Sequence, residues 1–427
     1  MTLLAVIIFL AVYVGLVATR SHRALVAWAG IVIALLAGAL RIREIAPSIN
    51  WNVLGIFAGT LILAELFIIS KVPETIADIL INRSANLGVA FIAIIAFTSF
   101  LSMFVENVAA ALIVAPIAIQ LARKAGVSPV PVIIGIAITS NLQGTATLIG
   151  DPPSMILGAA MKMNFMDFIF YHARGGTGSI KPGIFWFVQI GAVVSIGVLC
   201  LFFKGMRRRL DPIPVTSVFS LVPGLLLVIM ILLLSCATFV DPGFRWFGGA
   251  VCMVVALAGI VWYGAHDRSR VGTVLRGFDW GTAAFLAGVF VLVGMLDNRG
   301  VIGAVVSRLA VLKGAPPFIL YSAVVWVSVL LSGFIDNVPY VTAMLPVVMR
   351  FAVQAGLPVE IFAFGLLLGA CLGGNITPIG ASANVVAVGL LHREGYPVSF
   401  GRFMKMGLPF TVAATGAAYL ALWFAYR

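Results

Sequence analysis

The chain has 427 residues, of which 62% are hydrophobic and 10% are charged, and its mean hydropathy is +1.14. A water-soluble core cannot bury this much apolar surface, so lipid must cover it. The net charge of +12 would fit nucleic-acid binding, but the Lys and Arg residues lie in short clusters between apolar runs, as in the loops of membrane proteins. The composition therefore predicts a polytopic membrane protein and argues against nucleic acid as a partner.

Eight apolar runs have the length of about 17 to 25 residues that one crossing of the membrane requires. The strongest basic cluster, residues 204–209, marks a cytoplasmic loop, because positive charge gathers on the cytoplasmic side. The predicted spans lie near residues 2–19, 24–40, 52–70, 183–203, 219–240, 245–264, 280–297 and 406–426.

Four further apolar stretches are too long for one span. Residues 87–122 and 316–351 each carry an acid-Asn pair at the middle, and we predict that each forms a re-entrant hairpin with this pair at its tip. Residues 128–161 and 358–391 are each broken midway by Gly, Thr, Asn and Pro, which is typical of discontinuous helices.

The second half of the chain repeats the first half at an offset of 230 residues. At this offset LSMFVENV aligns with LSGFIDNV, and QGTATLIGD aligns with GGNITPIGA. The span that begins at Trp51 and its copy that begins at Trp280 run in opposite directions in the predicted topology, so the repeats are inverted. Inverted repeats with paired broken helices are typical of secondary transporters, whose substrate site lies at the midplane between the repeats.

The sequence therefore predicts an all-α polytopic membrane protein with two inverted-topology repeats, about 10 transmembrane helices, two re-entrant hairpins and two discontinuous helices. The predicted parts are N-terminal helices (1–45), the first repeat (46–204), a basic cytoplasmic linker (205–218), scaffold helices (219–274) and the second repeat with the last span (275–427).

The stretches GTATLIGDPPS, residues 144–154, and GGNITPIGASAN, residues 373–384, interrupt the two broken helices. Irregular backbone inside a membrane leaves amide and carbonyl groups unpaired, so it persists only where it lines a cavity or meets a ligand. We expect both loops and both hairpin tips to surround one small central site. The predicted substrate-binding residues are Asn107, Asn141, Thr145, Thr147, Ser154, Asn337, Asn375, Thr377, Ser382 and Asn384.

Three acidic residues are the candidates for proton or ion coupling, because ionisable residues within spans are functional by default. Glu106 and Asp336 lie at the hairpin tips, and Asp151 lies in the first loop. Structural roles stay open, since Asp151 could cap the helix that follows it and the tip acids could bind backbone amides. Glu65 and Asp297, each near the end of a span, are interpreted as structural or interfacial.

The hairpin tips, together with TATLIGDPPSMILG and GNITPIGASANVVAVG, resemble the ArsB/NhaD branch of the ion transporter superfamily, over nearly the whole chain. The superfamily includes arsenite and antimonite exporters, sodium/proton antiporters, and citrate or dicarboxylate carriers. The resemblance implies a fold of a scaffold domain plus a transport domain that carries the hairpins and broken helices. It also implies secondary active transport, which we expect in a prokaryotic inner membrane, and a possible homodimer, since dimers are common in the dicarboxylate branch.

Departures from the family pattern narrow the substrate. Sodium-coupled dicarboxylate carriers are expected to have Ser-Asn-Thr at both tips, where this chain has Glu-Asn-Val (106–108) and Asp-Asn-Val (336–338). A carboxylate there repels a dianion unless it is protonated or paired. We therefore expect a proton-coupled arsenite or antimonite efflux permease, with a NhaD-type Na⁺/H⁺ antiporter as the alternative and a Na⁺-coupled citrate or dicarboxylate carrier third. The expected partners are this small inorganic substrate or cation, the coupling H⁺ or Na⁺, and the lipid bilayer.

No catalytic, cofactor or metal site is expected. The chain has no HExxH, GxSxG or Walker motif, and its four cysteines show no CxxC spacing. A channel built around the broken helices stays open as an alternative, and a proton or sodium requirement for uphill flux would separate a carrier from it.

Overall fold

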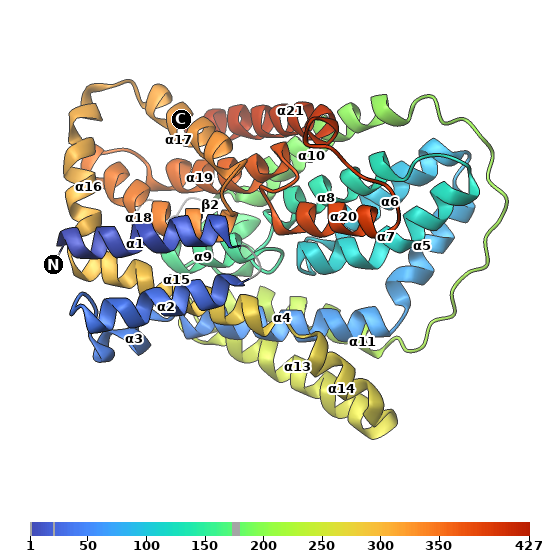
Figure 1. Cartoon of the computed structure of the whole chain (residues 1–427), viewed down its shortest axis with the longest axis horizontal. Helices are drawn as coiled ribbons and strands as arrows, with labels where there is room; N and C mark the ends of the chain where they lie inside the picture. The colour runs from blue at the N-terminus through green and yellow to red at the C-terminus, as the bar shows by residue number, and fades with distance from the viewer. Residues whose placement is uncertain (1, 20–21, 173–179) are drawn as a thin grey trace.

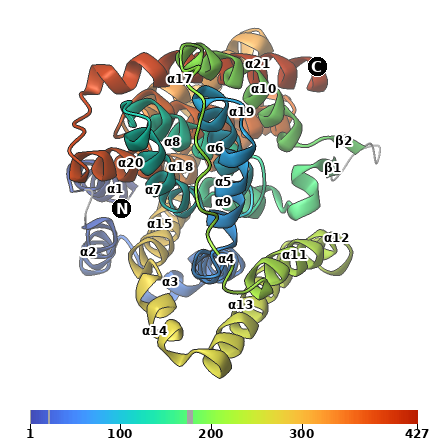
Figure 2. The same cartoon turned by 90° about the vertical axis from the view of Figure 1, so that its right-hand side faces the viewer.

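The computed structural model describes residues 2–19, 22–172 and 180–427. In these residues nine helices are long and apolar enough to cross a membrane. The expected all-α fold is confirmed, with one addition. Two short antiparallel strands, β1 (Phe170–His172) and β2 (Ile180–Pro182), project from the side of the molecule in Figure 2.

One layer of helices, named the scaffold below, lies along the lower part of Figure 1. Its central members are α4, which packs along α13, and α15, which packs on α2. The helices of this layer are α2 (Arg23–Leu36), α3 (Ile42–Ser48), α4 (Trp51–Ile69), α11 (Val222–Ser235), α12 (Ala237–Val240), α13 (Phe247–His266), α14 (Arg268–Gly277) and α15 (Trp280–Asn298). Helices α1 (Thr2–Ala18) and α16 (Val301–Leu309) both contact α15.

Small residues bring α4 and α13 into close contact. A Cβ placed on Gly59 would lie 2.3 Å from the backbone carbonyl carbon of Cys252, and one on Gly55 would lie 2.9 Å from the Cα of Gly249. Glycine lets the two backbones approach this closely, as at many helix interfaces in membranes. The scaffold is therefore fixed by backbone-to-backbone packing at this contact.

The second layer contains the paired hairpins and broken helices. The hairpin α6–α7 and the hairpin α17–α18 enter from opposite ends of the molecule, and their tips meet near its centre (Figure 1). The helices of this transport unit are α6 (Leu87–Leu101), α7 (Asn107–Lys124), α8 (Val130–Gly144), α9 (Pro152–Met161), α17 (Pro317–Ser332), α18 (Asn337–Ala355), α19 (Val359–Gly373) and α20 (Ser382–Arg393).

The second half of each broken helix packs against helices of the other repeat. Helix α9, which belongs to the first repeat, packs on α18 and α19 of the second, while α20 packs on α7 and α8 of the first. The remaining elements flank this unit. They are α5 (Val72–Arg83), α10 (Ile184–Phe203), α21 (Phe400–Tyr426) and the short 3₁₀ helices η2 (Phe165–Phe168), η3 (Ala310–Gly314) and η4 (Gly374–Ile376).

The predicted repeat is visible in single hydrogen bonds. The hydroxyl of Thr147 donates to the carbonyl of Met103, and 230 residues later the hydroxyl of Thr377 donates to the carbonyl of Gly333. Each bond ties a broken-helix loop to the hairpin of its own repeat. The same offset relates the bond from Ser102 to the Ser140 carbonyl, at 2.9 Å, to the bond from Ser332 to the Ala370 carbonyl, at 2.5 Å.

The basic linker lies extended along α5. In the linker, the carbonyl of Arg208 accepts a hydrogen bond from the backbone amide of Leu87 at the start of α6. The amide and the hydroxyl of Thr216, also in the linker, both donate to the carboxylate of Asp78 on α5, at 2.8 and 2.7 Å. These bonds hold the connection between the two halves of the chain against the first repeat.

Candidate functional site

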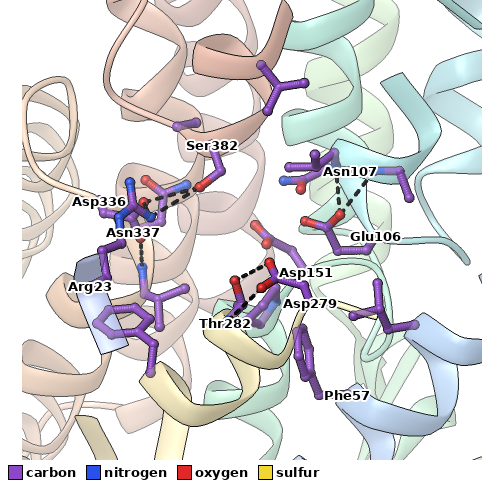
Figure 3. Close-up of a pocket in the computed structure, with 18 of the residues that line it drawn as sticks. Arg23, Phe57, Glu106, Asn107, Asp151, Asp279, Thr282, Asp336, Asn337 and Ser382 are labelled. Carbon is purple, nitrogen blue, oxygen red and sulfur yellow. Dashed lines mark hydrogen bonds and ion pairs between the residues drawn. The ribbon is translucent and has the colours of Figure 1, made fainter. Parts of the chain in front are cut away.

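A cavity of about 260 Å³ lies where the two hairpin tips meet the scaffold helices α2, α4 and α15. Figure 3 shows tip residues on both sides of this cavity and scaffold residues beside them. Its polar and charged lining comprises Arg23, Glu65, Glu106, Asn107, Asp151, Asp279, Thr282, Asp336, Asn337 and Ser382. A cavity therefore lies at the hairpin tips, the region in which the sequence analysis predicts a central site.

Both tip acids cap the helix that follows them. The Glu106 carboxylate accepts hydrogen bonds from the backbone amides of Val108 and Ala109, at 2.9 and 3.1 Å, and the Asp336 carboxylate accepts from the amide of Val338 at 3.1 Å. Amide donors at a helix N-terminus favour a negative charge. The structural role that the sequence left open for these two residues is therefore present, and it places both carboxylates at the cavity wall.

The two tips differ in their cationic partners. Arg23, the first residue of α2, donates from Nη1 to Asp336 Oδ2 at 2.7 Å and to the Ser382 hydroxyl at 3.3 Å. The side chains of Arg23 and Asp336 are 22% and 17% exposed, so water screens this pair only in part. Glu106 has no such cation among the residues that the structure describes.

Asp151 occupies the N-cap position of α9, but its side chain makes no capping hydrogen bond. The residue is buried at 5% exposure, and no described residue donates a hydrogen bond to its carboxylate. Its charged neighbours are Glu106 and Asp336. The side chain is therefore a carboxylate held at the cavity wall without a stabilising partner.

The scaffold contributes four lining residues that the sequence analysis did not assign to the site. The carboxylate of Glu65 on α4 lies against Gly277, where a Cβ would meet an Oε atom at 3.0 Å. Asp279 caps α15 by accepting from the amide of Thr282 at 2.8 Å. The sequence analysis interprets Glu65 as structural or interfacial, and the structure places it in the cavity lining. Its signal in the sequence is a carboxylate within a span. Arg23 and the Asp279–Thr282 cap gave no comparable signal, because a basic residue at a span end is common.

Three of the predicted substrate-binding residues line the cavity, namely Asn107, Asn337 and Ser382. The other seven lie behind its wall, bonded to one another or to the backbone, so the structure does not bring them to the cavity surface. They are Asn141, Thr145, Thr147, Ser154, Asn375, Thr377 and Asn384.

Asn141 is the junction of this buried network. Its side chain accepts from Asn107 at 2.9 Å and donates to Asn375 and Asn384 at 2.9 and 3.1 Å. Asn384 in turn donates to the carbonyls of Gly374 and Thr377, both at 3.0 Å. Because carbonyls freed by an unwound helix need donors, these amides hold the loops in shape and join the two repeats.

Two hydroxyl groups of the first loop bond within their own broken helix, whereas those of Thr147 and Thr377 bond to the hairpins. Thr145 donates to the Asn141 carbonyl at 3.1 Å, and Ser154 lies 3.4 Å from the carbonyls of Gly144 and Thr145. Within the described part of the chain, no group of three or more His, Cys, Asp or Glu side chains is arranged to hold a metal ion.

Inverted repeats, paired hairpins and a central polar cavity define a secondary transporter of the membrane. The chain belongs to the CitMHS citrate transporter family, which matches residues 13–369. This family is part of the ion transporter superfamily, as the sequence motifs indicate, although the comparisons do not single out the ArsB/NhaD branch.

Relatives cover the full length of the chain. An uncharacterized transporter of Synechocystis sp. is 28% identical over 97% of this chain and 96% of its own length, and one of Mycobacterium tuberculosis is 28% identical over 100% and 99%. The human P protein is 26% identical over 98% of this chain and 59% of its own length. The crystal structure of the Alcanivorax borkumensis YdaH transporter, described as having an unusual topology, shares the fold with a TM-score of 0.63 at 16% identity, over 99% of this chain and 97% of that one.

Proposed function

We propose that this chain is a proton-coupled secondary transporter of a prokaryotic inner membrane whose cargo is a small uncharged or cationic solute. The observation that carries the proposal is the charge of the cavity. Five carboxylates and one guanidinium line a volume of about 260 Å³. The surplus of acids repels an anion with two or three charges unless most of the acids are protonated.

Arsenite and antimonite are the first candidate cargo. Arsenous acid is uncharged at neutral pH, so it needs hydrogen-bonding partners in place of counter-ions. The amides of Asn107 and Asn337 and the hydroxyl of Ser382 line the cavity and could supply them. The volume is also small, which suits a solute of few atoms.

A sodium ion is the second candidate, because it could replace protons on the cavity carboxylates and give Na⁺/H⁺ exchange. Citrate is the third. The description of the family as citrate transporters supports citrate as cargo, whereas the five cavity carboxylates would repel a citrate anion.

Glu106 and Asp151 supply the coupling in this proposal. No cation among the described residues pairs with either carboxylate, and an unpaired carboxylate inside a membrane is costly unless it binds a proton or a cation. Proton binding in one conformation and release in the other would then link cargo movement to the pH gradient.

Everted membrane vesicles from a transporter-deficient host test the proposal. Under an imposed pH gradient we expect uphill arsenite or antimonite movement that needs no sodium. Sodium-dependent alkalinisation without arsenite movement would select the antiporter. Citrate accumulation would overturn the argument from cavity charge, and strictly downhill flux of all four solutes would contradict a carrier.

A further inference from the structure

The repeat relates Glu106 and Asp336, but their surroundings break its symmetry. Both carboxylates stand at a hairpin tip and accept backbone amides of their own helix. Among the residues that the structure describes, Arg23 is the one cation in the cavity lining, and it bonds the tip of the second repeat. Within this part of the chain, the first repeat therefore presents an acid without a cation where the second presents an ion pair.

We propose that Arg23 sets the number of exchangeable protons: it holds Asp336 as a fixed counter-ion and leaves Glu106 and Asp151 as the proton-carrying pair. The inference rests on the proposed function, since it divides the cavity acids between coupling and structure. Arg23 acts through Asp336 and is a positioning residue in this scheme.

The geometry favours a permanent pair over a chance contact. Trp28, one turn along α2, donates from its indole to the Ala284 carbonyl on α15 at 2.9 Å, which holds α2 against the scaffold. The guanidinium reaches Asp336 and Ser382 together, so two elements of the second repeat fix its position. An arginine keeps its proton in proteins, so a fixed positive charge stands beside the Asp336 carboxylate.

Among the described residues, no second cation lies beside Asp336. The titratable neighbours of Asp336 on other elements are Tyr13 on α1, Asp151 before α9 and Cys371 on α19. None of these side chains carries a positive charge. Loss of Arg23 would therefore leave the Asp336 carboxylate without a cationic partner, as Asp151 already is among the described residues. A buried carboxylate without such a partner is stable only when it binds a proton or a cation.

Infrared spectra of the purified full-length protein in lipid test this without knowledge of the cargo, because a protonated carboxyl group has a carbonyl band that a carboxylate lacks. In the unmodified protein we expect carbonyl bands of protonated carboxyl groups, one removed by Glu106→Gln and one removed by Asp151→Asn. Asp336→Asn should remove no band. Arg23→Gln should add one further band at neutral pH. That band should be absent from the double variant Arg23→Gln/Asp336→Asn, which assigns it to Asp336.

A matched control removes a different ion pair. Arg350 and Asp297 lie 2.7 Å apart, but their side chains are 48% and 44% exposed, so water solvates both groups and Arg350→Gln should add no band. Arg23→Lys keeps a positive charge near Asp336 and should retain the original spectrum. It is the control for misfolding, because it changes the same position without removing the charge.

Two results would overturn the inference: an Arg23→Gln spectrum without the new band, or a band of the unmodified protein that Asp336→Asn removes. The proposed function fails separately, when the vesicles show no proton-driven transport whatever the spectra contain. Where transport occurs, Arg23→Gln should change the cargo gradient that a given pH gradient sustains.

Discussion

Three carboxylates at the centre of the molecule differ in what stabilises their charge. Asp336 lies in an ion pair with Arg23, and Glu106 accepts two backbone amides. Asp151 has neither partner among the described residues, and the second repeat has Ala381 at the equivalent position. Asp151 is therefore the carboxylate whose charge the fold does least to stabilise, which favours a coupling role over a capping role.

Asp151→Asn keeps the size of this side chain and removes its titration. We expect the variant to insert and fold like the unmodified protein, since no hydrogen bond is lost, and to lose gradient-driven accumulation in everted vesicles. Asp297→Asn, outside the cavity, serves as the control and should retain accumulation. Full uphill transport by Asp151→Asn would remove this residue from the coupling role and leave Glu106 to be tested.

At the scale of elements, the contact between α4 and α13 holds the scaffold face of the cavity in place. Glu65 lies on α4, and Gly59, less than two turns before it, is in backbone contact with Cys252. A side chain at Gly59 has no space, because the atoms it would meet belong to the backbone of α13 and cannot rotate away. Displacement of α4 would also displace Glu65.

Gly59→Val should therefore destabilise the protein by about 1–3 kcal/mol, the usual cost of overpacking. Gly197→Val is the matched control, since a Cβ at Gly197 on α10 meets nothing within 4 Å. We expect thermal unfolding in detergent to shift downward for the first variant and to change little for the second. Equal unfolding temperatures for both variants would contradict the close packing of α4 on α13.

At the scale of the whole molecule, neither half of the chain forms the cavity alone. Helix α9 packs on α18 and α19, α20 packs on α7 and α8, and Asn141 bonds both Asn375 and Asn384 across the repeats. Each half thus contains half-helices and buried amides whose partners lie in the other half. Unpaired amides and carbonyls inside a membrane are costly, so the halves depend on one another.

The extended linker offers a place to test this dependence. Fragments 1–210 and 211–427, produced together, should co-purify, because the cut leaves every helix intact. Each fragment produced alone should aggregate or be degraded. A cut between residues 194 and 195, inside α10, is the control and should prevent recovery. A monodisperse, folded fragment obtained by itself would contradict the interlocked arrangement.

The sequence by itself determined the membrane class, the 230-residue repeat, the hairpins and the broken helices. These features depend on the length and spacing of apolar runs and on local signals such as Gly and Pro, which can be read along the chain. It also located three of the five acids of the cavity and three of its other polar residues, because charge and amide groups inside a span need a partner or a function.

Only the tertiary structure decided how those groups divide between the cavity and the network behind it. Arg23 meets Asp336 across 313 positions, and Asn141 meets Asn375 across 234. Glu65 reaches the cavity beside Gly277, and seven predicted binding residues turn to neighbouring carbonyls and amides instead. Such pairings depend on the direction in which each helix faces after packing, and a side chain's own sequence neighbours do not specify that direction.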